Sequence, residues 1–245
     1  MIKSKNKKKI PTSLTSDFAN LASHQLRTPL SGMKWILELL QRPSTGSLNK
    51  KQKEYLDKIV FFNDRLIALV NDLLEVSKAE QDGTQLHLQP TDITQIIRGL
   101  LKEKENEIKR KNFHVTFTVE QEPFPVVRTE PSKIKHALNN LLTNAFLYTP
   151  EDGRITIELT FANNNPSMLQ CAIKDTGMGI PKEEQKRIFD KFFRGSNVSR
   201  VESVGTGLGL YIAKAFIVAS GGKIWFESKT GKGSDFYFTL PIVKK

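Results

Sequence analysis

A helix in the second half of the chain carries the residues with the most evident chemical potential. Its sequence, PSKIKHALNNLLTNAFLYTP, spaces Asn140, Asn144 and Tyr148 four residues apart, so the three side chains share one helix face. Asparagine is a poor residue for a helix interior, and its repetition predicts a role for the carboxamides. Their oxygens are hard ligands suited to Mg²⁺ held jointly with phosphates. An exposed polar face without a ligand is the alternative.

The segment DTGMGI, residues 175 to 180, follows an apolar strand-like run. Gly177 and Gly179 would let the backbone approach a planar ligand closely. Asp175 could accept a hydrogen bond from an exocyclic amine such as that of adenine.

The segment GTGLGL, residues 205 to 210, precedes a helix that we expect to run to about Ala219. A glycine-rich turn at a helix N-terminus is a phosphate site, because the backbone amides and the helix dipole both favour anions. Such a motif is weak evidence by itself. A Rossmann site is excluded, because GTGLGL follows a polar stretch rather than a strand. The segment GKGSDFYF, from Gly231, reads individually as a hairpin turn.

In the first half, the stretch LASHQLRTPLSG places His24 inside a helical pattern. At about 100° per residue, His24 falls roughly 160° from the apolar seam, with Thr28 on the same outward side. A neutral imidazole has a free lone pair near pH 7 and can act as a nucleophile. His87 and His114 are interpreted as ordinary residues, as is His136, although His136 could assist the asparagine helix.

These residues must be positioned by two regions with different periodicity. Residues 14 to 80 show heptad spacing in two segments, separated by the reversal RPSTGSLN. The first apolar stripe comprises Leu26, Leu30, Met33, Leu37 and Leu40, and the second Tyr55, Ile59, Phe62, Leu66, Leu69, Leu73 and Val76. A hairpin that buries one stripe per helix predicts pairing with a second copy in a dimeric four-helix bundle.

After residue 83 the pattern changes to strand-like runs separated by helical stretches near residues 131 to 147, 182 to 190 and 207 to 219. The fold class is therefore multi-domain α and α/β, with a helix layer on a mixed sheet in the second domain. We expect a basic tail over residues 1–13, the helical hairpin over 14–82 and the α/β sandwich over 83–245.

Composition is ordinary for a globular protein: 245 residues, 38% hydrophobic, 26% charged. The net charge of +11 includes five lysines within the first eleven residues. This tail could contact an anionic membrane face or nucleic acid, be solvated or artificially added, or lie beside a membrane segment absent from this chain. Aromatic and basic residues are not interleaved, so we expect no nucleic-acid partner. No apolar run is long enough to cross a bilayer, and the single Cys171 is interpreted as a reduced core residue of a cytoplasmic protein.

In combination, the motifs resemble a known family. The helix asparagines, DTGMGI, FDKFFRG, GTGLGL and GKGS occur in the order of the nucleotide site of GHKL ATPases, and more closely of the N, G1, F, G2 and G3 boxes of sensor histidine kinases. SHQLRTPL resembles the phosphoacceptor box of the same family. The resemblance extends from about Thr15 to Pro241. Gyrase, heat-shock and mismatch-repair ATPases share the nucleotide fold without the histidine hairpin.

The resemblance implies an ATP- and Mg²⁺-dependent kinase that phosphorylates His24 and passes the phosphoryl group to an aspartate of a response regulator. Asn140 and Asn144 would hold the metal, and residues from about 182 to 203 would form a lid anchored by Phe189, Phe192 and Phe193. Plain core packing is the alternative for these phenylalanines. The implied nucleotide-binding residues are Asn140, Asn144, Tyr148, Asp175, Gly177, Gly179, Ile180, Arg194, Gly205, Thr206, Gly207, Leu208 and Gly209.

Around His24, the resemblance and the helix geometry give further expectations. Thr28 would assist dephosphorylation of the regulator. Trp35 continues the outward face and is predicted to contact the regulator, with packing against the neighbouring helix or nucleotide domain as the alternative.

Two positions depart from the family pattern. Gln25 stands where many relatives have an acid; it can orient the imidazole but cannot act as a base, which predicts a slower autokinase. Leu147 stands where relatives often have a basic residue, and Lys191 or Arg194 could supply that phosphate contact. A catalytically weak ATP-binding adaptor is the main alternative function, and a stand-alone GHKL ATPase the second.

Overall fold

The computed structural model describes residues 12–81, 86–163, 165–196 and 205–243, with side chains omitted at residues 12–24 and 78–81. Residues 1–11 of the expected basic tail and the side chain of His24 thus lie outside the described residues, whereas residues 12 and 13 belong to the first helix. The chain divides into two compact units, Met1–Gly83 and Thr84–Lys245.

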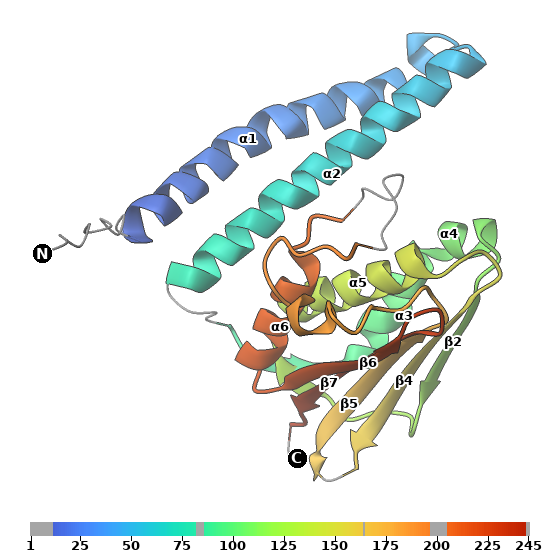
Figure 1. The fold of residues 1–245 in the computed structure, drawn as a ribbon. Coiled ribbons are helices and arrows are strands. Elements are labelled where there is room, and N and C mark those ends of the chain that lie inside the picture. The colour runs from blue at the N-terminus through green and yellow to red at the C-terminus, as the bar shows by residue number, and fades with distance from the viewer. Residues whose placement is uncertain (1–11, 82–85, 164, 197–204, 244–245) are drawn as a thin grey trace, which may run out of the picture. The chain divides into compact units, whose positions relative to one another are not determined.

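The first unit is an antiparallel helical hairpin (Figure 1). Helix α1 spans Thr12–Leu40, a short 3-10 helix spans Pro43–Thr45, and α2 spans Lys50–Gln81. In the reversal between the helices, Gly46 adopts a φ of 99°. Asn49 and Gln52 form a reciprocal capping box at the start of α2, in which each side chain accepts from the other residue's backbone N–H at 2.9 Å. Pro29 lies inside α1.

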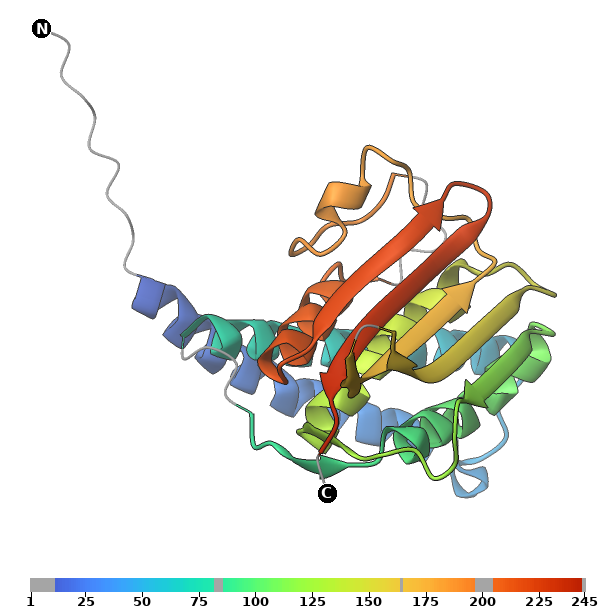
Figure 2. The ribbon, with the colours of Figure 1, turned by 90° about the horizontal axis from the view of Figure 1, so that it is seen from below.

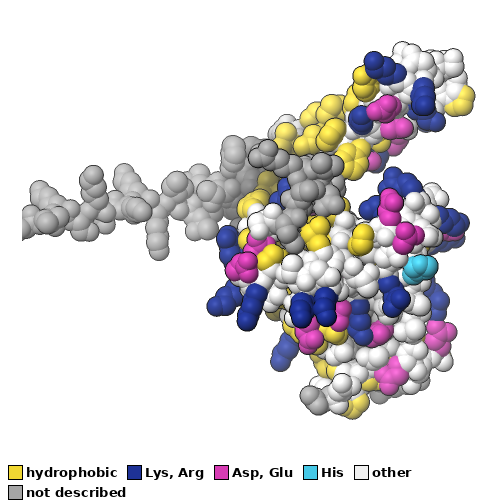
Figure 3. Space-filling model, turned by 45° about the vertical axis from the view of Figure 1, so that its right-hand side comes forward, with side chains coloured by type: hydrophobic (Ala, Val, Ile, Leu, Met, Phe, Trp, Pro, Cys, Tyr) yellow, Lys and Arg dark blue, Asp and Glu magenta, His cyan; other side chains and the backbone are white. Residues whose placement is uncertain are grey.

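The apolar stripe predicted for α2 is exposed over its first part, half-buried at Leu69 and Leu73, and buried at its last member, Val76. Leu56, Asn63 and Val70 are buried against α1, and they lie one residue away from the predicted seam. The first four members of the predicted stripe remain 46–55% exposed: Tyr55, Ile59, Phe62 and Leu66. On α1, Leu30 and Leu37 are buried, whereas Leu26, Met33 and Leu40 are exposed. Helix α2 therefore carries two adjacent seams, and hydrophobic side chains line the hairpin surface (Figure 3).

Polar pairs at heptad spacing connect the two helices. Arg27 bonds to Asn71, Lys34 to Asp64 and Gln41 to Asp57. The spacing is seven residues on each helix, so the pairs define one antiparallel register. We refer to these three pairs as the interhelical polar ladder.

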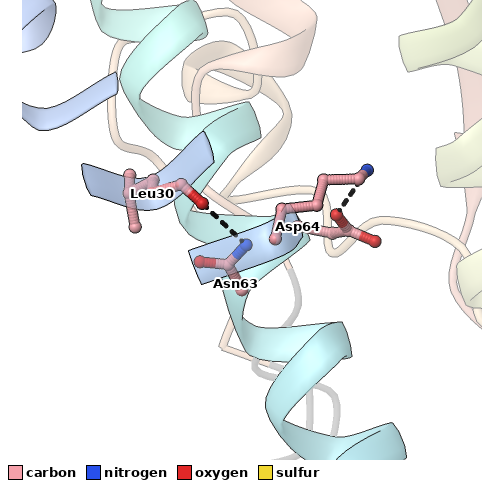
Figure 4. Close-up of polar contacts among 4 residues, drawn as sticks. Leu30, Asn63 and Asp64 are labelled. Atoms are coloured by element: carbon pink, nitrogen blue, oxygen red, sulfur yellow. Dashed lines mark hydrogen bonds and ion pairs between the residues drawn. The ribbon is translucent and has the colours of Figure 1, made fainter. Parts of the chain in front are cut away.

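Asn63 lies inside the hairpin core beside this ladder. Its Nδ2 donates to the backbone oxygen of Leu30 at 3.1 Å (Figure 4). The side chain is 5% exposed, and its Oδ1 has no hydrogen-bond partner among the described residues. A polar residue at a seam position commonly specifies register at some cost in stability.

The second unit has helices packed on one face of a mixed sheet (Figure 2). The helices are α3 (Ile93–Glu103), α4 (Glu105–Arg110), α5 (Pro131–Tyr148) and α6 (Gly209–Ala219). The sheet has the order β2-β4-β5-β7-β6, from His114–Val119, Arg154–Ala162, Asn165–Asp175, Gly233–Pro241 and Lys223–Lys229. Among the described strands of this sheet, β2 and β4 pair in parallel and the other neighbours pair antiparallel.

The core of this unit lies between the helices and the inner sheet face. Fully buried side chains alternate along the central strands, as at Ile155, Ile157 and Leu159 of β4. Cys171 is buried in β5, as expected, and burial raises the pKa of its thiol far above the ordinary range. Asp92 begins α3 by accepting from the N–H of Gln95.

Two features differ from the sequence-based expectations. The stretch near residues 182 to 190 is not an α-helix: only a 3-10 turn forms, at Gln185–Arg187. A two-stranded sheet, β1 (Gln89–Thr91) with β3 (Val127–Thr129), was not anticipated, because three-residue strands are too short to show a period. Within the described ranges, no helix is long and apolar enough to cross a membrane.

Candidate functional site

Asp175 occupies the end of β5 and is held by two backbone amides. Its Oδ1 accepts from the N–H of Gly177 at 2.8 Å and from that of Ser234 at 3.3 Å. Burial raises the pKa of this carboxyl to about 6, while the two amides act in the opposite direction. Both of these bonds use Oδ1, so Oδ2 is the atom suited to accept from a ligand amine.

Close backbone packing explains the glycines that follow Asp175. A Cβ at Gly177 would lie 2.5 Å from the backbone oxygen of Tyr148. Gly179 has a φ of 67°, and a Cβ there would lie 2.1 Å from the oxygen of Lys229. The DTGMGI loop is thus clamped between the end of α5 and the β6–β7 hairpin.

The β6–β7 hairpin contributes residues that lie outside the glycine and asparagine motifs. Ser228 Oγ accepts from the N–H of Ile180 at 2.9 Å, and Gln185 Nε2 donates to the backbone oxygens of Ile180 and Ser228 at 3.1 Å. Ser228 also pairs with Ser234 across the hairpin. These residues are distant in sequence. The β6–β7 register places Ser228 opposite Ser234, and the β5–β7 register places Asp175 opposite Ser234, so the segment after β5 meets the β6–β7 hairpin here.

The second glycine turn meets the asparagine helix directly. Asn140 Nδ2 donates to the backbone oxygen of Gly209, the first residue of α6, at 3.1 Å. Gly205 lies near Tyr148, since a Cβ there would be 4.0 Å from the Tyr148 hydroxyl oxygen. The structure therefore brings the asparagine face of α5, the loop that follows Asp175 and the turn at residues 205 to 209 close together.

Other residues of this turn are positioned by the backbone. Gly207 has a φ of 73°, and a Cβ there would lie 2.7 Å from backbone carbon of Phe192. The hydroxyl of Thr206 accepts from the N–H of Leu208 at 3.2 Å, and Leu208 is fully buried. Asn144 and Leu147 are half-buried on α5.

The described part of the expected lid, residues 182 to 196, is anchored by aromatic and cationic contacts. Phe189 packs edge-on against Phe226 at 6.0 Å between ring centroids, so packing is part of its role. Phe192 is 59% exposed at a φ of 60°. Lys191 Nζ lies 5.0 Å from the centroid of the Tyr211 ring, and Arg194 is exposed. Residues 197 to 203 of the expected lid lie outside the described residues.

The residues present fit a magnesium ion held jointly with phosphates. The hydrogen bond to Gly209 occupies the amide nitrogen of Asn140 and leaves its carbonyl oxygen as the ligand atom. Asn144 presents a second carboxamide one turn away. Mg²⁺ typically takes one or two protein oxygens and completes its shell with phosphate and water.

The stretch around residue 24 lies in the first unit. Residue 24 is within α1, and Gln25, Thr28 and Pro29 are exposed. Trp35 is 61% exposed on the same helix.

Comparison with protein families assigns both units. Residues 15–82 match the His Kinase A (phospho-acceptor) domain, and residues 129–244 match the histidine kinase-, DNA gyrase B- and HSP90-like ATPase family.

Individual relatives cover nearly the whole chain. The sensor histidine kinase WalK of Bacillus subtilis (strain 168) is 35% identical over 228 residues, 92% of this chain and 36% of that protein. The sensor protein kinase WalK of Staphylococcus aureus is 31% identical over 229 residues, again 92% of this chain and 53% of that protein. The chain thus spans about a third to a half of the length of these relatives.

Solved structures show the same architecture. The crystal structure of full-length ShkA in complex with AMPPNP superposes with a TM-score of 0.74 at 25% identity, covering 94% of this chain and 46% of that one. The catalytic domain of the histidine kinase ThkA superposes with a TM-score of 0.56 at 29% identity, covering 64% of this chain and 97% of that one. Both domain families match in consecutive order, and the WalK relatives match 92% of this chain, so the chain belongs to the two-component sensor histidine kinases.

Proposed function

We propose that this chain is the ATP-dependent kinase core that phosphorylates its own His24. The observation that carries this proposal is the convergence of Asn140, Asp175 and the 205–209 turn on one side of the α/β unit, in a chain that also contains the phosphoacceptor domain. An imidazole nitrogen of His24 would attack the γ-phosphorus. The new N–P bond forms as the bond to the β–γ bridging oxygen breaks, ADP leaves, and the proton on the other ring nitrogen is released to water.

The expected nucleotide-binding residues of the α/β unit would each have a part in this step. Asp175 would accept from the adenine amine, and Tyr148 would pack beside the base. The backbone amides of residues 205 to 209 would receive the phosphates at the start of α6. Arg194 would reach the phosphates from the lid. Mg²⁺, held by Asn140 and Asn144, would neutralise phosphate charge.

A response regulator is the proposed acceptor of the phosphoryl group, and the chain would act as a homodimer. Thr28, on the surface of α1, is proposed to assist dephosphorylation of the regulator, so Thr28→Ala should remove phosphatase activity and spare autophosphorylation.

Trp35 is proposed to contact the regulator, because a tryptophan 61% exposed on a helix is a typical anchor of an interface. Trp35→Ala should slow phosphotransfer alone; equal loss of both reactions would contradict this role.

We also propose a cytoplasmic location, with any membrane attachment through a segment outside this chain. The free, buried thiol of Cys171 supports a cytoplasmic location. A catalytically weak ATP-binding adaptor is the second candidate function. Its support is Gln25, which lacks the basicity of a carboxylate.

Incubation with γ-labelled ATP and Mg²⁺ tests the proposal. We expect acid-labile label on the wild-type chain and none on His24→Ala. Nucleotide binding without any labelling would favour the adaptor. Label retained in His24→Ala, or ATP hydrolysis without protein labelling, would favour a GHKL ATPase of another kind.

A further inference from the structure

Arg27 carries a positive charge that no carboxylate balances among the described residues. Its Nε and Nη2 both donate to Oδ1 of Asn71, at 3.2 and 2.9 Å. Across the described ranges, this neutral carboxamide is the only hydrogen-bond partner of the guanidinium. The contact between α1 and α2 is therefore a hydrogen bond to a neutral group and not an ion pair.

The next pair of the interhelical polar ladder is built differently. One heptad further along, Lys34 Nζ lies 2.8 Å from Asp64 Oδ1, and the bond to this carboxylate raises the pKa of Lys34. Asparagine and aspartate have nearly the same size, so either would fit a position of the ladder. The neutral residue stands at the position closest to His24, and the charged one stands a heptad away.

Arg27 lies close to His24 in the sequence of α1 and could bind a phosphoryl group there. Residues 24 and 27 are three apart on α1, and such positions are neighbours on a helix surface. A guanidinium binds phosphoryl oxygens through paired N–H groups. Two of its five N–H groups are used on Asn71, which leaves three for an anion.

We propose that Arg27 binds the phosphoryl group carried by His24, and that Asn71 is the positioning residue that holds Arg27 there without neutralising it. This inference rests on the proposed function, since it needs a phosphorylated His24. The alternative is that the Arg27–Asn71 contact only connects the helices, as Lys34–Asp64 does.

Chemical phosphorylation separates this inference from the kinase activity. The full chain is treated with potassium phosphoramidate, which phosphorylates imidazoles without ATP, and the phosphohistidine is titrated by ³¹P NMR. Comparison with His24→Ala assigns its resonance. A nearby uncompensated cation favours the dianionic phosphoryl group and so lowers its pKa. Asp72 and Glu75 on α2 also carry charge near this end of the hairpin, and they remain unchanged in every variant.

Asn71→Asp should convert the contact into an ion pair and raise the midpoint of the titration by about 0.5 pH. Arg27→Gln should raise it at least as far, and Asn71→Ser, which keeps a neutral acceptor oxygen, should stay near the wild type. Asp64→Asn is the matched control, because it changes the same kind of charge one heptad away, and it should leave the midpoint in place.

Three results would overturn the proposal. They are an unchanged midpoint in Asn71→Asp, an equal change in Asp64→Asn, or no resonance that depends on His24. If Asn71→Asp fails to fold by circular dichroism, Arg27→Lys against Arg27→Gln decides: lysine should keep most of the lowered pKa. Autophosphorylation kinetics provide a second readout, in which Asn71→Asp lowers kcat about fivefold at an unchanged KM for ATP.

Discussion

At the scale of single residues, Asp175, the proposed acceptor for the adenine amine, has a raised carboxyl pKa. Burial raises the pKa of its carboxyl to about 6, above its ordinary value. For a carboxyl whose pKa is raised on folding, ionisation destabilises the folded chain: the cost is absent below the ordinary pKa and complete above pH 6 or so. A ligand amine that donates to the carboxylate offsets this cost.

The affinity for ATP should therefore increase with pH through about 6 and level off above it. We expect affinity to fall about tenfold between about pH 7.5 and pH 5, measured by calorimetry. Asp175→Asn should bind more weakly at neutral pH and lose this part of the pH dependence. Since the phosphates of ATP titrate nearby, the comparison between the two proteins is the test; parallel profiles would remove Asp175 from the adenine site.

We expect Gln25 to limit the rate of autophosphorylation. It is exposed beside His24 on α1 and can orient an imidazole without accepting its proton. Gln25→Glu should raise the initial rate of autophosphorylation about tenfold or more, because a positioned base contributes at least that much. Gln25→Ala, which removes the orienting oxygen too, should lower the rate. A rate that is unchanged or reduced in Gln25→Glu would contradict this interpretation.

At the scale of the element, the hairpin retains a polar residue inside its seam. Asn63 makes one hydrogen bond to Leu30 and leaves a buried Oδ1 without a partner in the described structure. An unpaired buried acceptor is unfavourable by about 1–3 kcal/mol. The ladder pairs also contribute to the register, so the register does not depend on Asn63 alone.

Asn63→Leu should accordingly raise the free energy of unfolding by about 1–2 kcal/mol, measured by chemical denaturation at one fixed protein concentration. Asn63→Ala is the control, because it loses the same polar atoms and leaves a cavity; it should be less stable than Asn63→Leu by about 2 kcal/mol or more. A less stable Asn63→Leu would indicate that Oδ1 finds a partner in the assembled protein.

At the scale of the whole molecule, the second seam of α2 bears on assembly. Tyr55, Ile59, Phe62 and Leu66 form an exposed apolar stripe at heptad spacing, which is suited to a second hairpin. Two helices from each copy would bury it in the proposed four-helix bundle.

Phe62→Asp should therefore convert a dimer into monomers at micromolar concentration, measured by sedimentation equilibrium. Phe61→Asp is a matched control: Phe61 is adjacent, of the same type and 47% exposed, but one residue further round the helix, about 100° away from the stripe. It should leave the dimer intact. Equal dissociation by both variants, or by neither, would contradict assembly through this stripe.

Much of this protein is readable from its amino-acid sequence. Periodicity distinguishes the heptad hairpin from the α/β unit, and the long strands and helices occur where alternation or a 3.6-residue repeat is sustained, as in β4 and α5. The order of the glycine and asparagine motifs also indicates the family, because each motif is local and its residue types are set by close backbone approach, as the positive φ of Gly179 and Gly207 illustrates.

Only the tertiary structure decided which of two adjacent stripes on α2 packs within the chain. Leu56 and Tyr55 are both apolar and differ by one position, and periodicity cannot choose between them without the register that the ladder imposes. Periodicity likewise cannot predict that Ser228 accepts from the N–H of Ile180 or that Asn71 accepts from Arg27. Sequence reports which residues share an element; which residues meet across elements depends on register, a property of the packed chain.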